Sequence, residues 1–302
     1  MNQKILVVGS SNTDMVIKAA KFALPGETIL GGEFFMNPGG KGANQAIAAS
    51  RLGGDVTFVG KVGSDIFGRQ ALQQLTKENI ETRFVIVDHE YPSGVALINV
   101  DSKGQNCIVV APGANGQLQP ADIDHVLSEV PQENLVLVQL EIPIDTVTHL
   151  IRKTAELGNR LILNPAPAQN LPNELFASIY TITPNETEIE LLTGIRVKDI
   201  GSAKAAGSKL LDLGVQQVII TLGSQGAYLH TSSISKLIAA PEVTAVDTTA
   251  AGDCFNGALA VALAEDMGME SAVHFACRAA AISVTRMGAQ QSIPYRKELQ
   301  QR

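Results

Sequence analysis

Short apolar runs, rich in branched side chains, alternate with helical segments along most of the chain. Buried strands are predicted at 4–9, 56–59, 135–139, 160–164 and 218–222. Helices are predicted at 43–52, 70–78, 144–157, 203–213, 255–265 and 271–285. Because consecutive parallel strands need a crossover helix, the alternation predicts an α/β fold with a central, mostly parallel sheet and helices on both faces.

Composition narrows the class of protein. The chain has 302 residues, 45% hydrophobic and 18% charged, which suits one large α/β domain over residues 1–302 with a sizeable core. A net charge of −7, 4% aromatic residues and no Trp argue against nucleic acid and anionic membranes as partners. Neither a signal peptide nor an apolar span of about 20 residues is recognised.

Two segments break the alternation. Residues 14–36 hold strand-like pieces without a clear helix, and residues 93–110 read as a hairpin around 101–104. Two such excursions predict a small second sheet, which would serve as a lid over a site. Two ordinary surface hairpins are the alternative.

The three cysteines are Cys107, Cys254 and Cys277, and they show neither CxxC spacing nor an even count. This predicts no zinc site and no disulfide framework, and favours a reducing, cytoplasmic compartment. Cys254 directly follows Asp253, but we favour a packing role over a reactive thiolate because no His or Asn supports it.

The run DTTAAGD at 247–253 leads into an apolar helix. Small residues at a helix start expose backbone N–H groups, and the helix dipole adds partial positive charge. An acid beside such an anion site is reasonable if it takes a proton next to a phosphoryl group. The alternative is that Asp253 is only an early-helix or capping acid.

Polar side chains follow two predicted strands. Asn12 and Asp14 come after the strand at 4–9, and Glu141 comes after the strand at 135–139. Ligands of open α/β sheets bind at the carboxyl ends of strands, and an amide beside carboxylates suits sugar hydroxyls. An Asx-turn and a solvated acid are the alternatives.

The glycine-rich segment GGKGAN at 39–44 enters the helix at 43–52. Its glycines allow a ligand close to the backbone, while Lys41 and Asn44 add polar groups. The segment matches neither the P-loop nor the GxGxxG fingerprint. A helix entry that binds no ligand remains open.

Three further segments carry oxygen-rich or glycine-rich patterns. Asn185 and Glu188 have capping-box spacing; the alternative is that they lie near a magnesium–phosphate assembly and act on it through water. The segment 221–226 is either a tight turn between strands or a close approach to a nucleotide. The segment 283–292 holds many oxygens, but it also reads as a helix end with a stop at Gly288.

The order of these motifs resembles the ribokinase, or PfkB, family of sugar kinases, from about residue 4 to residue 295. The resemblance implies that Asp253 is the catalytic base, beside an anion hole formed by the backbone N–H groups of Ala250, Ala251, Gly252 and Asp253. It implies a sugar site of Asn12, Asp14, Gly40, Lys41, Gly42, Ala43, Asn44, Glu141 and Asp253. It implies a nucleotide site of Asn185, Thr221, Leu222, Gly223, Ser224, Gln225, Gly226, Gly252, Asp253 and Cys277. Glu188 would order Mg²⁺ through water, and a monovalent-cation site would comprise Asp247, Thr249, Ser283, Arg286, Gly288 and Ser292.

The resemblance further implies transfer of the ATP γ-phosphoryl to O5 of D-ribose, with Mg²⁺ and K⁺ as cofactors and a homodimer formed through the lid. A kinase for 2-deoxyribose or fructose is the nearest alternative. A catalytically idle sugar or nucleotide sensor on the same fold is another. A Rossmann dehydrogenase is disfavoured because no GxGxxG follows the first strand.

Overall fold

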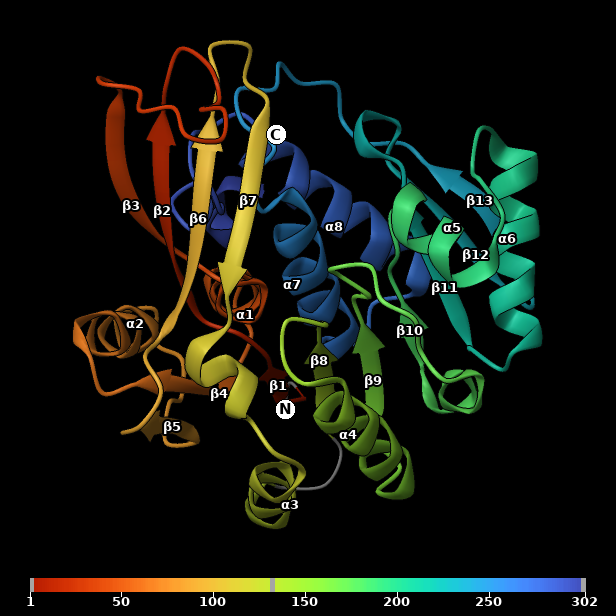
Figure 1. The fold of residues 1–302 in the computed structure, drawn as a ribbon. Coiled ribbons are helices and arrows are strands. Elements are labelled where there is room, and N and C mark those ends of the chain that lie inside the picture. The colour runs from red at the N-terminus through yellow and green to blue at the C-terminus, as the bar shows by residue number, and fades with distance from the viewer. Residues whose placement is uncertain (1–2, 131–133, 300–302) are drawn as a thin grey trace.

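The computed structural model describes residues 3–130 and 134–299, and within them nine strands form the central sheet (Figure 1). Their order is β13-β12-β11-β10-β9-β8-β1-β4-β5. All neighbours from β5 to β11 pair in parallel, whereas β12 pairs antiparallel with both β11 and β13. The strands are β1 (Ile5–Val8), β4 (Val56–Gly63), β5 (Val85–Asp88), β8 (Leu135–Val138), β9 (Arg160–Leu163), β10 (Thr181–Ile182), β11 (Gln217–Thr221), β12 (Ala227–Thr231) and β13 (Ser235–Ile238). The predicted mostly parallel α/β fold is confirmed.

Helices cover both faces of this sheet because alternate side chains of each strand point to opposite sides. In β1, Ile5 and Val7 join one core cluster, whereas Leu6 and Val8 join the other. The first cluster includes residues of α1 (Lys41–Arg51), α2 (Ile66–Lys77), α7 (Ala251–Ala264), α8 (Met269–Ser283) and α9 (Arg296–Leu299). The second includes residues of α3 (Pro120–Glu129), α4 (Ile144–Glu156), α5 (Glu186–Thr193) and α6 (Ile200–Asp212).

Two helices begin four residues earlier than the apolar periodicity predicts. Helix α2 starts at Ile66 because the Asp65 carboxylate accepts a hydrogen bond from Gly68 N and caps the first turn. Helix α7 starts at Ala251, four residues before the predicted start, and Ala250 before it adopts a left-handed conformation (φ 59°). The first turn of α7 therefore contains Asp253.

The two β excursions form a second sheet in the order β3-β2-β6-β7. Its strands are β2 (Asn12–Lys18), β3 (Glu33–Gly39), β6 (Gly94–Val100) and β7 (Asn106–Ala111). In Figure 1 these red to yellow strands stand apart from the central sheet, on the same side of the view as α1. The predicted second sheet is confirmed; that it acts as a lid remains a prediction.

The central sheet has its switch point at β1, which lies between β4 and β8. The chain passes from β1 through β2 and β3 into α1, whose Gly42 lies against the end of β1. A Cβ on Gly42 would come within 2.6 Å of Ser10 N. Helix α7 packs equally closely on α1, since a Cβ on Gly257 would lie 2.5 Å from Ala48 Cβ and 2.6 Å from Gln45 O. These contacts bring the first turns of α1 and α7 to the crevice at the carboxyl ends of β1 and β8.

Candidate active site

Asp253 is the buried acid at the centre of the site. Its side chain is 6% exposed, and each carboxylate oxygen accepts one hydrogen bond from α1. Asn44 Nδ2 donates to Oδ2 over 2.9 Å, and Gln45 Nε2 donates to Oδ1 over 3.0 Å. The carboxylate is therefore held in one orientation, while further lone pairs remain for a substrate hydroxyl.

Free backbone donors surround this carboxylate. Helix α7 has no side-chain cap at its N-terminus. Among the described residues, no acceptor takes the N–H groups of Ala250, Gly252 or Asp253. The N–H of Ala251 differs from the prediction, because it donates to Thr248 O over 3.2 Å. Three of the four predicted donors are thus available to an anion at the positive end of α7.

The electrostatics of Asp253 suit proton abstraction. Burial raises the pKa of Asp253, and the charge of Glu141 acts in the same direction. Lys41 and the hydrogen bonds from Asn44 and Gln45 oppose this shift without cancelling it. A carboxylate with a raised pKa is a stronger base than an ordinary aspartate, which favours a role beyond helix capping.

Glu141 and Lys41 connect the end of β8 to the glycine-rich loop. Glu141 Oε2 accepts hydrogen bonds from Ser10 Oγ (2.5 Å) and from Lys41 N (2.9 Å). Burial works to lower the pKa of Lys41, but the carboxylates of Asp253 and Glu141 outweigh it and raise the pKa. The Lys41 ammonium is thus kept charged in the middle of an acidic site.

Asp14 faces this centre from the second sheet. Burial raises the pKa of Asp14 to about 6, and the charges of Glu141 and Asp253 add to the shift. The carboxylate lies against the backbone of Gly39, where a Cβ would come within 2.3 Å of its oxygens. Asp14 is therefore an acceptor at the junction of the second sheet and α1, as its position after β1 predicts.

Asn115 is a contributor that the sequence did not reveal. It lies in a short 3-10 helix (Gly113–Gln117) after β7 and is 1% exposed. Its Nδ2 donates to Asn12 Oδ1 over 2.8 Å, and its Oδ1 accepts from Ser11 N over 2.9 Å. These bonds fix the Asn12 amide. They come from a residue 103 positions further along the chain, so no local sequence pattern indicates the pairing.

Asn185 and Glu188 form the capping box that their spacing predicts. Glu188 N donates to Asn185 Oδ1, while Asn185 N and Nδ2 donate to the two Glu188 oxygens. Burial raises the pKa of Glu188, although the Asn185 N–H and Lys41 lower it, and the charge of Asp253 raises it further. Glu188 is therefore within electrostatic reach of Asp253, so the cap also belongs to the site.

The turn at 221–226 lies beside this cap. Thr221 N donates to Pro184 O over 2.9 Å, and Gly223 and Gly226 both have positive φ angles. The turn joins the antiparallel strands β11 and β12, as the alternative interpretation predicted, and it also places Gly223–Gln225 at the surface next to Asn185.

Cys277 does not reach this surface. Its side chain is 4% exposed within the core cluster around α7 and α8, and burial raises its pKa to about 12. A direct side-chain contact with a nucleotide is therefore not supported by its position.

A cavity of about 360 Å³ lies between α8 and the segment before Asp247, a place that the sequence did not single out. Its lining residues are Pro241, Val243, His274, Arg278, Ala281 and Ile282.

Of the residues predicted for a monovalent cation, Thr249 and Gly288 are hydrogen-bonded to Asp247, whereas the Ser283 and Ser292 hydroxyls donate to Ala280 O and Ala289 O. Asp247 Oδ2 accepts from Gly288 N over 2.9 Å, and Oδ1 accepts from Thr249 Oγ1 over 2.6 Å. Partial burial works to raise the pKa of Asp247, but the bonds from Thr249 and Gly288 outweigh it and lower the pKa. Arg286 turns its guanidinium to Glu298, so only its carbonyl can face a cation. The Asp247 carboxylate supplies oxygen atoms of the kind that a hard cation prefers.

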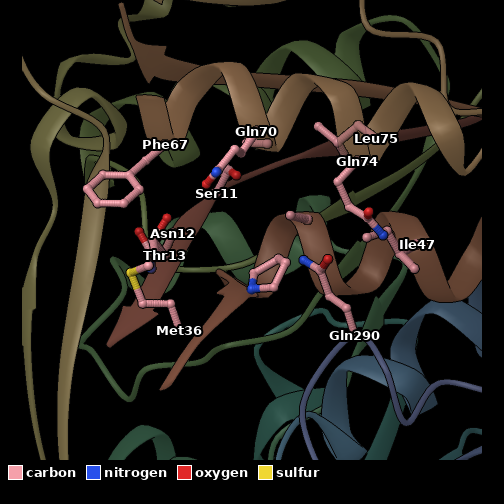
Figure 2. A pocket seen from close by; sticks show the side chains of 13 residues that line it. Ser11, Asn12, Thr13, Met36, Ile47, Phe67, Gln70, Gln74, Leu75 and Gln290 are labelled. Carbon is pink, nitrogen blue, oxygen red and sulfur yellow. The ribbon is translucent and has the colours of Figure 1, made fainter. Parts of the chain in front are cut away.

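Another cavity, of about 80 Å³, lies between the second sheet and α2 (Figure 2). Thr13 and Met36 line it from the second sheet, and Gln70 and Gln74 line it from α2. Thr13 and Asp14 are consecutive residues of β2, so their side chains point to opposite faces of that sheet. The cavity is therefore on the other face of the second sheet from Asp14, although Asn12 and Ala43 of the predicted sugar site also line it.

Asp14→Asn should stabilise the unliganded protein at neutral pH. The pKa of Asp14 is raised in the folded protein, so its ionised form disfavours folding as the pH rises from about 4 to about 6. A rise of the pKa from 3.8 to about 6 limits the gain in the free energy of unfolding to about 3 kcal/mol above pH 6, at about 1.36 kcal/mol per pH unit. Urea unfolding at pH 8 should show the gain, and the gain should shrink toward pH 4.

Asp55→Asn provides the control, because the Asp55 side chain is 57% exposed. It should change the free energy of unfolding little at either pH. A loss of stability in Asp14→Asn at pH 8 would contradict the raised pKa assigned to Asp14.

Comparisons with known proteins agree with this geometry. A sequence model of the pfkB family carbohydrate kinases matches residues 2–296. The chain is 42% identical over 298 residues to a ribokinase of Haemophilus influenzae, covering 99% of this chain and 97% of that protein. It is 37% identical over 291 residues to a deoxyribokinase of Salmonella typhi, covering 96% of this chain and 95% of that protein.

The fold is similar to that of an Arabidopsis thaliana ribokinase complexed with ribose and ATP. The TM-score is 0.91 and the identity 33%, covering 100% of this chain and 98% of that one. The resemblance inferred from the order of the motifs is thereby confirmed. The chain belongs to the pfkB family of carbohydrate kinases and is ribokinase-like in sequence and fold.

Proposed function

We propose that this kinase transfers the γ-phosphoryl group of ATP to O5 of D-ribose and forms ribose 5-phosphate. The observation that carries the proposal is the buried Asp253 carboxylate, oriented by two amides beside free N–H groups of α7. A base and an anion hole are thus placed side by side in one helical turn. Phosphoryl transfer to a hydroxyl needs this pair of devices.

Asp253 takes the proton of the attacking hydroxyl in this reaction. The N–H groups of Ala250, Gly252 and Asp253 stabilise the negative charge of the phosphoryl group as it moves between oxygens. The oxygen of the sugar becomes bonded to phosphorus, the bond to the ADP oxygen breaks, and the proton stays on Asp253. Positioning supplies much of the rate, and the base supplies about 10²–10⁴-fold.

Polar groups on three elements suit a sugar with several hydroxyls. Asp14 and Asn12 reach the site from the second sheet, and Glu141 from the end of β8. Asn44 Oδ1 is buried and accepts no hydrogen bond within the described residues. A sugar hydroxyl that donates to it would remove an unpaired acceptor, so a sugar lacking that hydroxyl would bind less well. The deoxyribokinase relative makes 2-deoxyribose the second candidate acceptor.

The nucleotide would lie along the turn at 221–226 and Asn185, with its base in the 360 Å³ cavity against α8. Within the described residues, no group of three or more His, Cys, Asp or Glu could hold a metal directly. Glu188, a carboxylate within electrostatic reach of Asp253, would order Mg²⁺ through water, because hard cations prefer oxygen ligands. When bound, Mg²⁺ supplies charge neutralisation to the phosphates.

Asp253→Asn is the test of this function. The amide cannot take a proton, so turnover with ribose should fall by at least about a hundredfold. Binding of ATP should persist because the N–H donors and the nucleotide cavity are unchanged. A coupled assay of ADP release would measure turnover, and calorimetry would measure ATP binding.

Asp55→Asn, an acid-to-amide change at an exposed site, is the matched control and should retain full turnover. Turnover by Asp253→Asn equal to that of the unchanged protein would exclude Asp253 as the base.

A monovalent cation would bind at the segment joining Asp247 to 283–292. Asp247 N and Val246 N both donate to Val284 O, so this segment is hydrogen-bonded to the end of α8. Asp247 lies six residues before Asp253 in the same loop. A cation at Asp247 would therefore rigidify the turn that carries the anion hole.

Turnover should be faster in K⁺ than in tetramethylammonium at equal ionic strength, because the large cation cannot enter a carbonyl-lined site. Asp247→Asn should weaken the response to K⁺, since one anionic ligand is lost. Initial rates over a K⁺ titration measure both effects. Equal rates in the two cations would contradict a role for a monovalent cation in turnover.

We also propose that the second sheet is a lid and the contact of a homodimer. Its face opposite Asp14 bears a cross-strand row of Met36, Met15, Leu97 and Val109. Met36, Leu97 and Val109 are 51%, 52% and 69% exposed. Exposed apolar side chains gathered on one sheet face are typical of an interaction surface, and a second copy would cover them.

The unchanged protein should have twice the 31.9 kDa chain mass in light scattering. Leu97→Glu should shift this mass toward that of the monomer, because it places a charge in the middle of the row. Leu191→Glu, at an exposed leucine on α5, is the control and should stay dimeric. A monomeric unchanged protein would contradict the dimer.

A further inference from the structure

Three buried amide side chains form a hydrogen-bonded series behind Asp253. Gln139 Nε2 donates to Gln45 Oε1 over 2.6 Å, and Gln45 Nε2 donates to Asn164 Oδ1 over 3.0 Å. Asn164 Nδ2 in turn donates to the backbone oxygen of Thr183 at 3.4 Å. Gln45 and Gln139 are fully buried and Asn164 is 7% exposed. The series runs across the carboxyl ends of β8, β9 and β10.

The direction of this series is set by its end at Thr183. A carbonyl oxygen only accepts, so Asn164 must turn its NH₂ group to Thr183 and its oxygen to Gln45. Gln45 must then turn its own NH₂ group to Asn164 and its oxygen to Gln139. Asp253 lies on the NH₂ side of Gln45, so it always meets a donor.

Stability alone does not explain these amides. Burying polar groups in the core costs free energy unless all their hydrogen bonds are made. Gln139 Oε1 is buried and accepts no hydrogen bond from any residue that the structure describes. Apolar side chains of similar size would avoid this unpaired oxygen. The series therefore keeps a destabilising feature next to the base.

We propose that Gln45 is a positioning residue for Asp253, fixed in its donor orientation by Gln139 and Asn164. This inference rests on the proposed function, because it gives Gln45 a part in orienting the base of that reaction. Gln45 has no exposed surface, so it cannot touch a substrate and acts only through Asp253. It holds the carboxylate in place and favours its ionised, proton-accepting form.

The same anchor also holds the anion hole. Thr183 Oγ1 donates to Asn256 Oδ1 over 2.6 Å, and Asn256 Nδ2 donates to Gly252 O over 2.8 Å. Thr183 thus connects the amides behind Asp253 with the backbone turn before it. The base and the anion hole are held at a fixed separation by one residue at the end of β10.

Gln45→Met tests the proposal, since methionine keeps the size of the side chain and removes the donor. A hydrogen bond to a carboxylate favours its ionised form, so its loss should raise the pKa of Asp253. The acid limb of kcat/KM for the sugar should move up by about one pH unit, and kcat should fall about tenfold. KM for ATP should stay unchanged.

Gln217→Met is the matched control. Gln217 lies at the opposite end of β11 from the site, where its Oε1 accepts one hydrogen bond, from Thr181 Oγ1. This variant should leave the pH profile in place. Gln139→Met is the second test variant, for use if Gln45→Met folds poorly. It frees the Gln45 amide without removing it, so its shift should have the same sign and be smaller.

A double-variant cycle separates positioning from a general structural effect. In an Asp253→Asn background, Gln45→Met should change residual turnover little, because the group on which it acts is absent. An equal fall in both backgrounds would overturn the proposal.

NMR titration of ¹³C-labelled aspartate carboxyls gives a readout that needs no activity, with Asp253 assigned by its loss in Asp253→Asn. The pKa of Asp253 should be higher in Gln45→Met than in the unchanged protein or in Gln217→Met. An unmoved pKa in both Gln45→Met and Gln139→Met would overturn the positioning role. Absence of sugar phosphorylation by the unchanged protein would instead refute the proposed function, and the titration would still be readable.

Discussion

Burial of the Asp253 carboxylate at the start of α7 is the constraint on which the site depends. A charge removed from water needs donors, and both come from α1, through Asn44 and Gln45. They can reach it because α1 and α7 touch at Gly257, where a Cβ would collide with Ala48 and Gln45. Helix packing and the orientation of the Asp253 carboxylate thus both depend on one close contact.

Charge balance gives a physical role to the backbone dipoles of the site and to the cations that we propose there. Four carboxylates, those of Asp14, Glu141, Glu188 and Asp253, act on the single ammonium of Lys41. Such a site opposes a polyanionic nucleotide unless the positive end of α7 and bound cations offset the excess. Burial is the main cause of the raised pKa values of Asp14, Glu188 and Asp253, and the charges of neighbouring carboxylates add to each shift. The positive end of α7 and bound cations, which are not charged side chains, would therefore let a phosphoryl donor bind in an acidic site.

Much of the architecture was predictable because it depends on residues that are close together in the sequence. Apolar runs and helical periodicity gave the sheet, and small residues before Asp253 indicated the anion site. The positions of Asn12, Asp14 and Glu141 followed from strand ends. Partners far apart in sequence were not predictable: Gln45 and Gln139 look like ordinary polar residues within a helix and after a strand, and Asn115 pairs with Asn12 across 103 residues. The early start of α7 was missed because its first turn has no apolar periodicity, and the buried position of Cys277 depends on the packing of α8.

The central claim is that Asp253 and the α7 turn transfer phosphate to the primary hydroxyl of a pentose. It is tested most directly by NMR of the product from ATP and D-ribose, with 2-deoxyribose, fructose and ribonucleosides supplied in parallel. The account predicts a product whose phosphorus couples to the two protons on C5, formed fastest from ribose. A product phosphorylated at O1, or ATP consumption that no sugar accelerates, would contradict it.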